Sequence, residues 1–129
     1  MLNANYMLPS LEDMLDAPIG KTGPCMHEAL SSDAGFADGV STLDVAKALI
    51  DEGFHPMTMH FPLVVHAAML IEPTEAESKA ALDQFIASLR SIAARANAGD
   101  PSLAQAPQLA PRRRVDETAA ARKLRLVAR

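Results

Sequence analysis

The sequence predicts a small α+β domain in which helices cover one face of a three-stranded sheet. Stretches with helical spacing and short extended apolar stretches follow one another in the order helix, strand, helix, strand, strand, helix. The chain has 129 residues, the length of one ordinary domain. Aromatic residues make up 4% of the chain and hydrophobic residues 49%, so we expect a core of aliphatic, Met and Ala side chains.

The first predicted helical stretch runs from Leu2 to Ala17, where apolar residues recur near helical spacing. Pro9 lies inside it and removes one backbone donor, so a kink or two short helices are expected. Residues 18–24 contain two Pro and two Gly residues and predict a loop. Cys25 to Ser31 is the first predicted strand.

The second predicted helix has a start signal and a stop signal. Ser41 or Thr42 can cap a helix that runs through Asp44 to Glu52, and a carboxylate in the first turn favours the helix dipole. Gly53 follows the last turn, where glycine is the preferred residue.

Two more strands and a long helix are predicted next. The strands are Pro56 to Phe61 and Ala68 to Glu72. Thr74 and Glu77 have the spacing of a capping box, which predicts that Pro73-Thr74 opens the helix. Its apolar residues repeat at three and four positions as far as Ala96.

Charge divides the chain into an acidic part and a basic part. Residues 1–89 carry 13 acidic and three basic side chains, whereas residues 90–129 carry nine basic and three acidic ones. We expect residues 98–129 to form a basic, proline-containing tail that is solvated or folds back onto the acidic body. Nucleic-acid or membrane contact by the tail is a less favoured alternative, because no aromatic residues are interleaved with its basic ones.

The sequence contains no self-contained active site. It lacks a glycine-rich phosphate-binding loop, and its single cysteine excludes an internal disulfide. Cys25 and His27 could form a dyad, although Cys25 is more simply a buried inert thiol, and the His residues lack the tight spacing of zinc ligands. We therefore expect no metal site.

Polar residues near strand ends are the best candidates for a functional edge. His55 lies at a loop–strand junction, a usual place for a functional side chain, although a structural or merely exposed role remains the alternative. Glu72 and Glu75 flank Pro73-Thr74 and could act as an acid–base pair. The simpler interpretation is that Thr74 caps the helix and Glu75 favours its dipole.

The predicted location is cytoplasmic. One cysteine is typical of a reducing compartment, and the first residues include no basic segment of an export signal. The longest mostly apolar stretch, Phe61 to Ile71, has eleven residues, too few to cross a bilayer as a helix.

Several short motifs, in order along nearly the whole chain, resemble one enzyme family. The sequence is similar to the C-terminal part of the glycine decarboxylase P-protein, specifically the second subunit of its two-subunit bacterial form. The motifs are Asn3-Ala4-Asn5-Tyr6, Cys25-Met26-His27-Glu28, Thr42-Leu43-Asp44-Val45-Ala46-Lys47, Gly53-Phe54-His55-Pro56-Met57-Thr58, Met69-Leu70-Ile71-Glu72-Pro73-Thr74-Glu75 and Pro111-Arg112-Arg113-Arg114-Val115-Asp116-Glu117.

The resemblance implies the small C-terminal domain of a fold-type-I pyridoxal-phosphate enzyme. Such an enzyme decarboxylates glycine and passes the aminomethyl group to the lipoyl arm of the H-protein, while the cofactor acts as electron sink. The implied division is residues 1–17 as part of an inter-domain linking helix, residues 18–97 as the small domain and residues 98–129 as the tail. The implied substrate-pocket edge consists of His55, Thr58, Glu72 and Thr74.

The family's Schiff-base lysine lies upstream in a His-Lys context that this sequence lacks. We therefore expect the chain to bind no cofactor covalently and to be inactive alone. Its implied partners are the large domain, the first subunit, the H-protein and glycine, with no nucleic acid and no membrane. The alternative hypothesis is a free-standing α+β ligand-binding or regulatory module with its own pocket.

Overall fold

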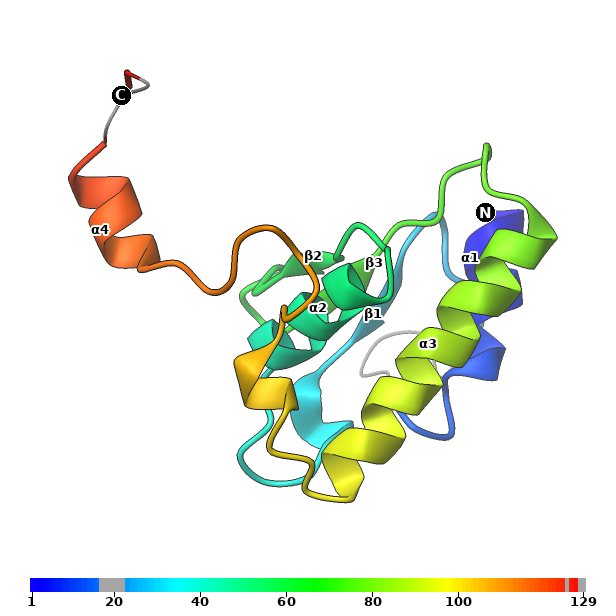
Figure 1. Cartoon of the computed structure of the whole chain (residues 1–129). Helices are drawn as coiled ribbons and strands as arrows, with labels where there is room; N and C mark the ends of the chain where they lie inside the picture. Colours follow the sequence, from blue (N-terminus) through cyan, green and yellow to red (C-terminus); the bar gives the residue numbers. More distant parts are fainter. Residues whose placement is uncertain (17–22, 125, 128–129) are drawn as a thin grey trace.

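The sheet of the protein is three-stranded and antiparallel throughout. The structure, a computed structural model, describes residues 1–16, 23–124, 126 and 127. The strands are β1 (Ala29–Ser31), β2 (Thr58–Met59) and β3 (Met69–Ile71), and β3 lies between the other two (Figure 1). Leu70 is the register partner of both Leu30 and Thr58, so β3 joins all three strands into one sheet.

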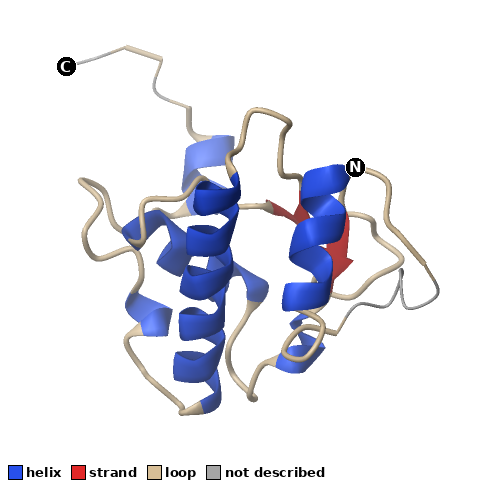
Figure 2. Ribbon diagram, turned by 90° about the vertical axis from the view of Figure 1, so that its right-hand side faces the viewer, coloured by secondary structure: helices blue, strands red, loops and turns tan. Residues whose placement is uncertain are grey.

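The described helices are α1 and α2, the longer α3, and α4 near the C-terminal end. Single 3₁₀ turns lie between them. The bounds are α1 (Leu2–Met7), α2 (Thr42–Asp51), α3 (Lys79–Asn97) and α4 (Glu117–Arg122), with 3₁₀ turns η1 (Leu8–Ser10), η2 (Asp33–Gly35) and η3 (Leu103–Gln105). Figure 2 shows α1, next to the N-terminus, in front of the strands and beside α3.

The helices cover one face of the sheet, as predicted. Ala29, Met69 and Ile71 point to the same face and belong to the main core, which also holds the buried side chains of α1, α2 and α3. Leu30 and Leu70 point to the opposite face and pack with residues of the β2–β3 connection. Core side chains such as Leu89 stabilise the fold by about 2 kcal/mol each through burial.

The second helix prediction is confirmed, whereas the first helical stretch, predicted to run from Leu2 to Ala17, ends at Ser10 and is followed by turns. Pro9 lies in η1, so the first stretch forms two short helices, and Ala17 at its predicted end lies outside the described residues. Helix α2 begins with a reciprocal capping box. The Ser41 hydroxyl accepts from the Asp44 N–H, and the Asp44 carboxylate accepts from the Ser41 N–H. Gly53 follows its end with φ +85°.

The first predicted strand was too long. Cys25 to Ser31 forms a strand at Ala29–Ser31 alone, because the backbone of Cys25 pairs with a side chain instead of a strand. The Asn5 amide donates to the Cys25 carbonyl over 2.7 Å and accepts from its N–H over 2.9 Å.

The other two strand predictions were also too long. The pairing of Pro56 to Phe61 is limited to Thr58–Met59, and His60 then takes a left-handed conformation with φ +64°, which turns the chain out of the sheet. The third strand is Met69–Ile71 rather than Ala68 to Glu72.

The predicted start of the long helix was wrong. Helix α3 begins after Ser78, whose hydroxyl accepts from the Ala81 N–H, and not after Thr74. The Thr74 carbonyl instead accepts from the Glu77 N–H in a separate turn. Both Thr74 and Ser78 carry a hydroxyl group that can cap a helix, and Ser78 is the residue that caps α3.

The packed body continues past residue 97. Leu103 and Ala106 are 1% and 3% exposed and lie in the main core, with η3 packed against α2. The Asp51 carboxylate then accepts hydrogen bonds from the backbone N–H groups of Gln108 and Leu109. The segment that follows α3 is therefore fixed to α2.

Arg114 fixes the tail to the acidic body. Its guanidinium donates to Asp44 Oδ1 over 2.5 Å and to the carbonyls of Ala106 and Leu103 over 2.8 and 3.2 Å. The tail thus folds back as far as Arg114. Among the described residues, no helix combines the length and the hydropathy that a membrane crossing requires.

We predict that Asp44→Asn lowers the free energy of unfolding by about 1–3 kcal/mol, because it weakens both a cap and the ion pair between the buried Asp44 carboxylate and the partly exposed Arg114. Burial raises the pKa of Asp44, but hydrogen bonds from Ser41 and from Arg114 outweigh it, so the pKa lies below its ordinary value. The stabilisation is therefore present above the unfolded pKa near 4 and is lost as pH falls through the lower folded pKa. Urea unfolding between pH 7 and pH 2 measures it.

Two matched variants separate the contribution of the helix cap from that of the ion pair. Ser41→Ala removes the hydroxyl cap and leaves the ion pair, whereas Arg114→Gln removes the pair and leaves the cap. An Asp44→Asn variant as stable as the parent at pH 7 would contradict the prediction.

Candidate functional site

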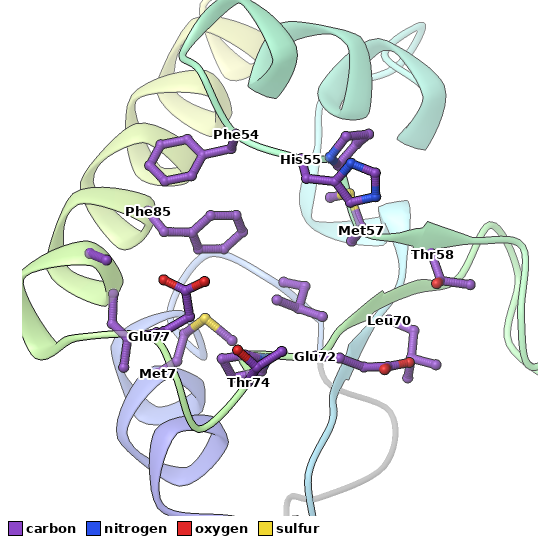
Figure 3. A pocket seen from close by; sticks show the side chains of 15 residues that line it. Met7, Phe54, His55, Met57, Thr58, Leu70, Glu72, Thr74, Glu77 and Phe85 are labelled. Atoms are coloured by element: carbon purple, nitrogen blue, oxygen red, sulfur yellow. The ribbon is translucent and has the colours of Figure 1, made fainter.

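A cavity of about 420 Å³ opens at one end of the sheet, where β2 begins and β3 ends. It is bordered by the end of α1, the segment after α2, the loop after β3 and the first turns of α3 (Figure 3). The lining residues are Met7, Phe54, His55, Pro56, Met57, Thr58, Leu70, Ile71, Glu72, Pro73, Thr74, Glu77, Ala81, Leu82 and Phe85. This volume is in the range of small-molecule sites.

All four predicted pocket-edge residues line this one cavity. His55 and Thr58 lie before and at the start of β2, and Glu72 and Thr74 follow β3. Because β2 and β3 are antiparallel, the start of one and the end of the other fall at the same edge. The structure therefore brings the four residues together, and their contact with a substrate stays a prediction.

The turn after α2 sets the position of His55. Gly53 N–H donates to the Ile50 carbonyl, and Phe54 N–H donates to the Leu49 carbonyl, which closes the end of the helix. The Phe54 ring then meets the Phe85 ring edge to face, with centroids 5.3 Å apart. This aromatic pair joins the turn to α3 and forms the apolar wall of the cavity.

The loop after β3 is held by α1. The Asn3 amide donates to the carbonyls of Thr74 and Glu77 over 2.7 and 3.3 Å. Helix α1 is in turn fixed to α3 by the Tyr6 hydroxyl, which donates to Asp83. Asp83 also accepts from Lys79, and this hydrogen bond is the main reason that the pKa of Lys79 is raised.

Sequence reasoning missed Glu77 as a site residue. It was assigned to a capping box, whereas it lines the cavity, and in Figure 3 its carboxylate lies beside the Phe85 ring. The apolar residues Met7, Phe54 and Phe85 were missed as well, because sequence alone does not separate a cavity wall from a core.

The ionisable side chains that line the cavity in the described part of the chain are two carboxylates and the His55 imidazole. Glu72 and Glu77 line it, and neither Lys nor Arg does. A neighbouring hollow of about 370 Å³ shares Glu72, Pro73 and Thr74 and is bordered by Met1, Leu2 and His27, among others. The Glu72–Thr74 segment therefore separates two hollows on the same edge.

Other chemical candidates do not form sites. His27 pairs with Glu28 over 2.9 Å, and His66 pairs with Asp33 over 3.1 Å. The backbone of Cys25 is held by Asn5. Among the described residues, no group of three or more His, Cys, Asp or Glu side chains is arranged to hold a metal ion.

Fold and cavity together define a small α+β domain with a cavity of small-molecule size at one edge of its sheet. Residues 1–107 match the family described as "Glycine dehydrogenase, C-terminal domain", and the chain belongs to this family.

The similar proteins are much longer than this chain. It is 62% identical over 128 residues to "Probable glycine dehydrogenase (decarboxylating) subunit 2" from Caulobacter vibrioides, covering 98% of this chain and 24% of that relative. Relatives of the same name are 45% identical in Desulforamulus reducens and 48% identical in Caldanaerobacter subterraneus, each covering 95% of this chain and 25% of the relative. The chain thus spans about a quarter of the length of these relatives.

We predict that Gly53→Ala lowers the free energy of unfolding by about 1 kcal/mol, because a Cβ is strained at φ +85°. No atom lies within 4 Å of the position of that Cβ, so the cost comes from the backbone alone. Gly53→Asn is the matched control and should cost less, because Asn tolerates this conformation better. Equal effects of the two variants in thermal unfolding would contradict this explanation.

Proposed function

We propose that this chain is the small domain of a fold-type-I pyridoxal-phosphate enzyme, the glycine-decarboxylating P-protein. The cavity edge formed by His55, Thr58, Glu72 and Thr74 borders its substrate pocket. The intact enzyme releases CO₂ from glycine and passes the aminomethyl group to the lipoyl H-protein. Membership of the family and the printed names of the relatives support this activity.

The observation that carries the proposal is the set of side chains that line the cavity. The chain spans about a quarter of the length of its relatives, so further lining residues can come from the rest of such a protein. The cavity gathers the predicted polar residues, yet no Lys or Arg among the described residues lines it. A pyridoxal-phosphate site needs a lysine for covalent attachment and cationic or N–H donors for the phosphate. The residues present do not fit the cofactor by themselves, so we assign its attachment to the rest of the enzyme.

In the proposed enzyme, this chain orients the substrate and encloses one side of its pocket. The aromatic wall of Phe54 and Phe85 excludes water from one side of the cavity, and the Asn3 contacts hold the Thr74 loop in place. The exposed Met1 and Leu2 side chains, 72% and 84% accessible, border the neighbouring hollow. They give the upstream domain an apolar surface on which to dock.

We predict that the isolated chain does not decarboxylate glycine and that a chimera does. The chimera carries these 129 residues in place of the matching part of the Caulobacter relative. Both are mixed with pyridoxal phosphate, the other subunit and lipoyl H-protein, and glycine-dependent CO₂ release is measured. Borohydride reduction should label no lysine of the isolated chain stoichiometrically, and stoichiometric labelling would overturn the proposal.

We predict that His55→Gln and Glu72→Gln in this chimera each lower kcat/KM for glycine by roughly tenfold or more, as expected for positioning groups at a pocket edge. Asp38→Asn is the control, since Asp38 is exposed and outside the cavity lining. Unchanged kinetics in both cavity variants would exclude this edge from the substrate pocket. Specific small-molecule binding by the isolated chain would favour a free-standing module instead.

A further inference from the structure

The loop between β3 and α3 carries one side of the cavity. This edge loop is defined here as residues 72–77, and its Thr74 and Glu77 line the cavity (Figure 3). Its two ends are fixed by the neighbouring elements, because Ile71 pairs in β3 and the Ser78 hydroxyl caps α3. The residues between these ends form neither helix nor strand, so contacts from elsewhere in the fold must set where they lie.

Asn3 supplies such a contact from α1. Its side-chain amide donates to the Thr74 carbonyl over 2.7 Å and to the Glu77 carbonyl over 3.3 Å. Among the described residues, no other side chain from outside the edge loop donates a hydrogen bond to it. Asn3 borders the neighbouring hollow and lies outside the lining of the cavity, so it acts on the cavity through the loop.

Helix α1 is fixed to the body by contacts that do not involve the edge loop. The Asn5 side chain exchanges two hydrogen bonds with the Cys25 backbone, and the Tyr6 hydroxyl donates to α3. Met7, one turn after Asn3, is 1% exposed, belongs to the main core and lines the cavity. The position of α1 therefore affects the cavity twice, directly through Met7 and through the edge loop by way of Asn3.

The two partners of Asn3 define the chemistry that its position requires. Both are carbonyl oxygens, which accept hydrogen bonds, and an Asn amide has two N–H groups with which to serve them. A carboxylate of the same shape, as in Asn3→Asp, would face two carbonyl oxygens and repel them. Asn3→Ala removes the donor but places a better helix former in α1, so it releases the loop without weakening the helix.

We propose that Asn3 is a positioning residue of the substrate pocket, because it holds the edge loop where Thr74 and Glu77 border a bound substrate. This inference rests on the proposed function. Without the two hydrogen bonds the loop spends part of its time elsewhere, and the apparent affinity for substrate falls in proportion to the fraction of molecules with the loop in place. The KM for glycine therefore rises, whereas molecules that have bound glycine react at the parent rate.

The test measures KM and kcat for glycine in variants of the chimera. Asn3→Ala should raise KM roughly fivefold to tenfold and leave kcat within about threefold, and Asn3→Asp should raise KM further. Asn3→Gln retains an amide donor and should keep KM within about threefold of the parent value. A variant that merely lowers the amount of folded enzyme would lower kcat and leave KM unchanged.

Asn5→Ala is the matched control. It removes the same amide from the same helix but releases the Cys25 backbone instead of the edge loop, so KM should stay within about twofold. Amide hydrogen exchange of residues 72–77, measured by mass spectrometry on the chimera, should be faster in Asn3→Ala and Asn3→Asp and unaltered in Asn5→Ala. This second measurement does not depend on activity.

The two measurements keep the possible failures apart. Unaltered exchange of the edge loop in Asn3→Asp overturns the positioning role. Faster exchange with an unchanged KM overturns it as well and leaves the proposed function standing. An equal rise of KM in Asn5→Ala assigns the effect to α1 as a whole, which also overturns it. A chimera without glycine-dependent activity overturns the proposed function and the positioning role together.

Discussion

The central strand β3 is the constraint on which the remaining structure depends. It has three residues and pairs on both sides, so its register fixes β1 and β2 at once. Its alternation sends Met69 and Ile71 to the helical core and Leu70 to the opposite face. A shift of one residue would exchange these faces and expose the core side chains. Because β3 runs directly into Glu72, the same register sets the edge at which the cavity opens.

Local sequence signals predicted the elements better than their ends. The α2 signals consist of a hydroxyl, a carboxylate three residues later and a terminal glycine, and each is satisfied within a few residues. The strand ends depend on distant partners. Cys25 leaves the sheet because Asn5, twenty positions earlier, binds its backbone. For α3, Thr74 and Ser78 compete as caps, and the Asn3 contact that holds the Thr74 carbonyl comes from α1.

The site residues that flank the strands were predictable from the sequence. Those that line the cavity through the packing of helices were not. His55, Thr58, Glu72 and Thr74 flank two antiparallel strands, so a pattern that places the strands also gathers these residues. Phe85 lies on the regular apolar repeat of α3, and nothing in that repeat separates it from Leu89, which is buried. Glu77 was hidden for a related reason, since its spacing from Thr74 imitates a cap that does not form.

The charge of the cavity limits how a substrate can lie within it. Two exposed carboxylates, Glu72 and Glu77, border it together with the His55 imidazole, and no Lys or Arg among the described residues does, so an anionic group placed beside the carboxylates meets repulsion. Under the proposed function, the anionic groups of glycine and of the cofactor therefore bind residues outside this chain. Under the same proposal, Glu72 and Glu77 would face the amine end of the substrate rather than its carboxylate. Under the proposed function, an edge of this charge would favour one orientation of a zwitterion over the reverse, because the reverse orientation would bring the carboxylate of the substrate towards Glu72 and Glu77.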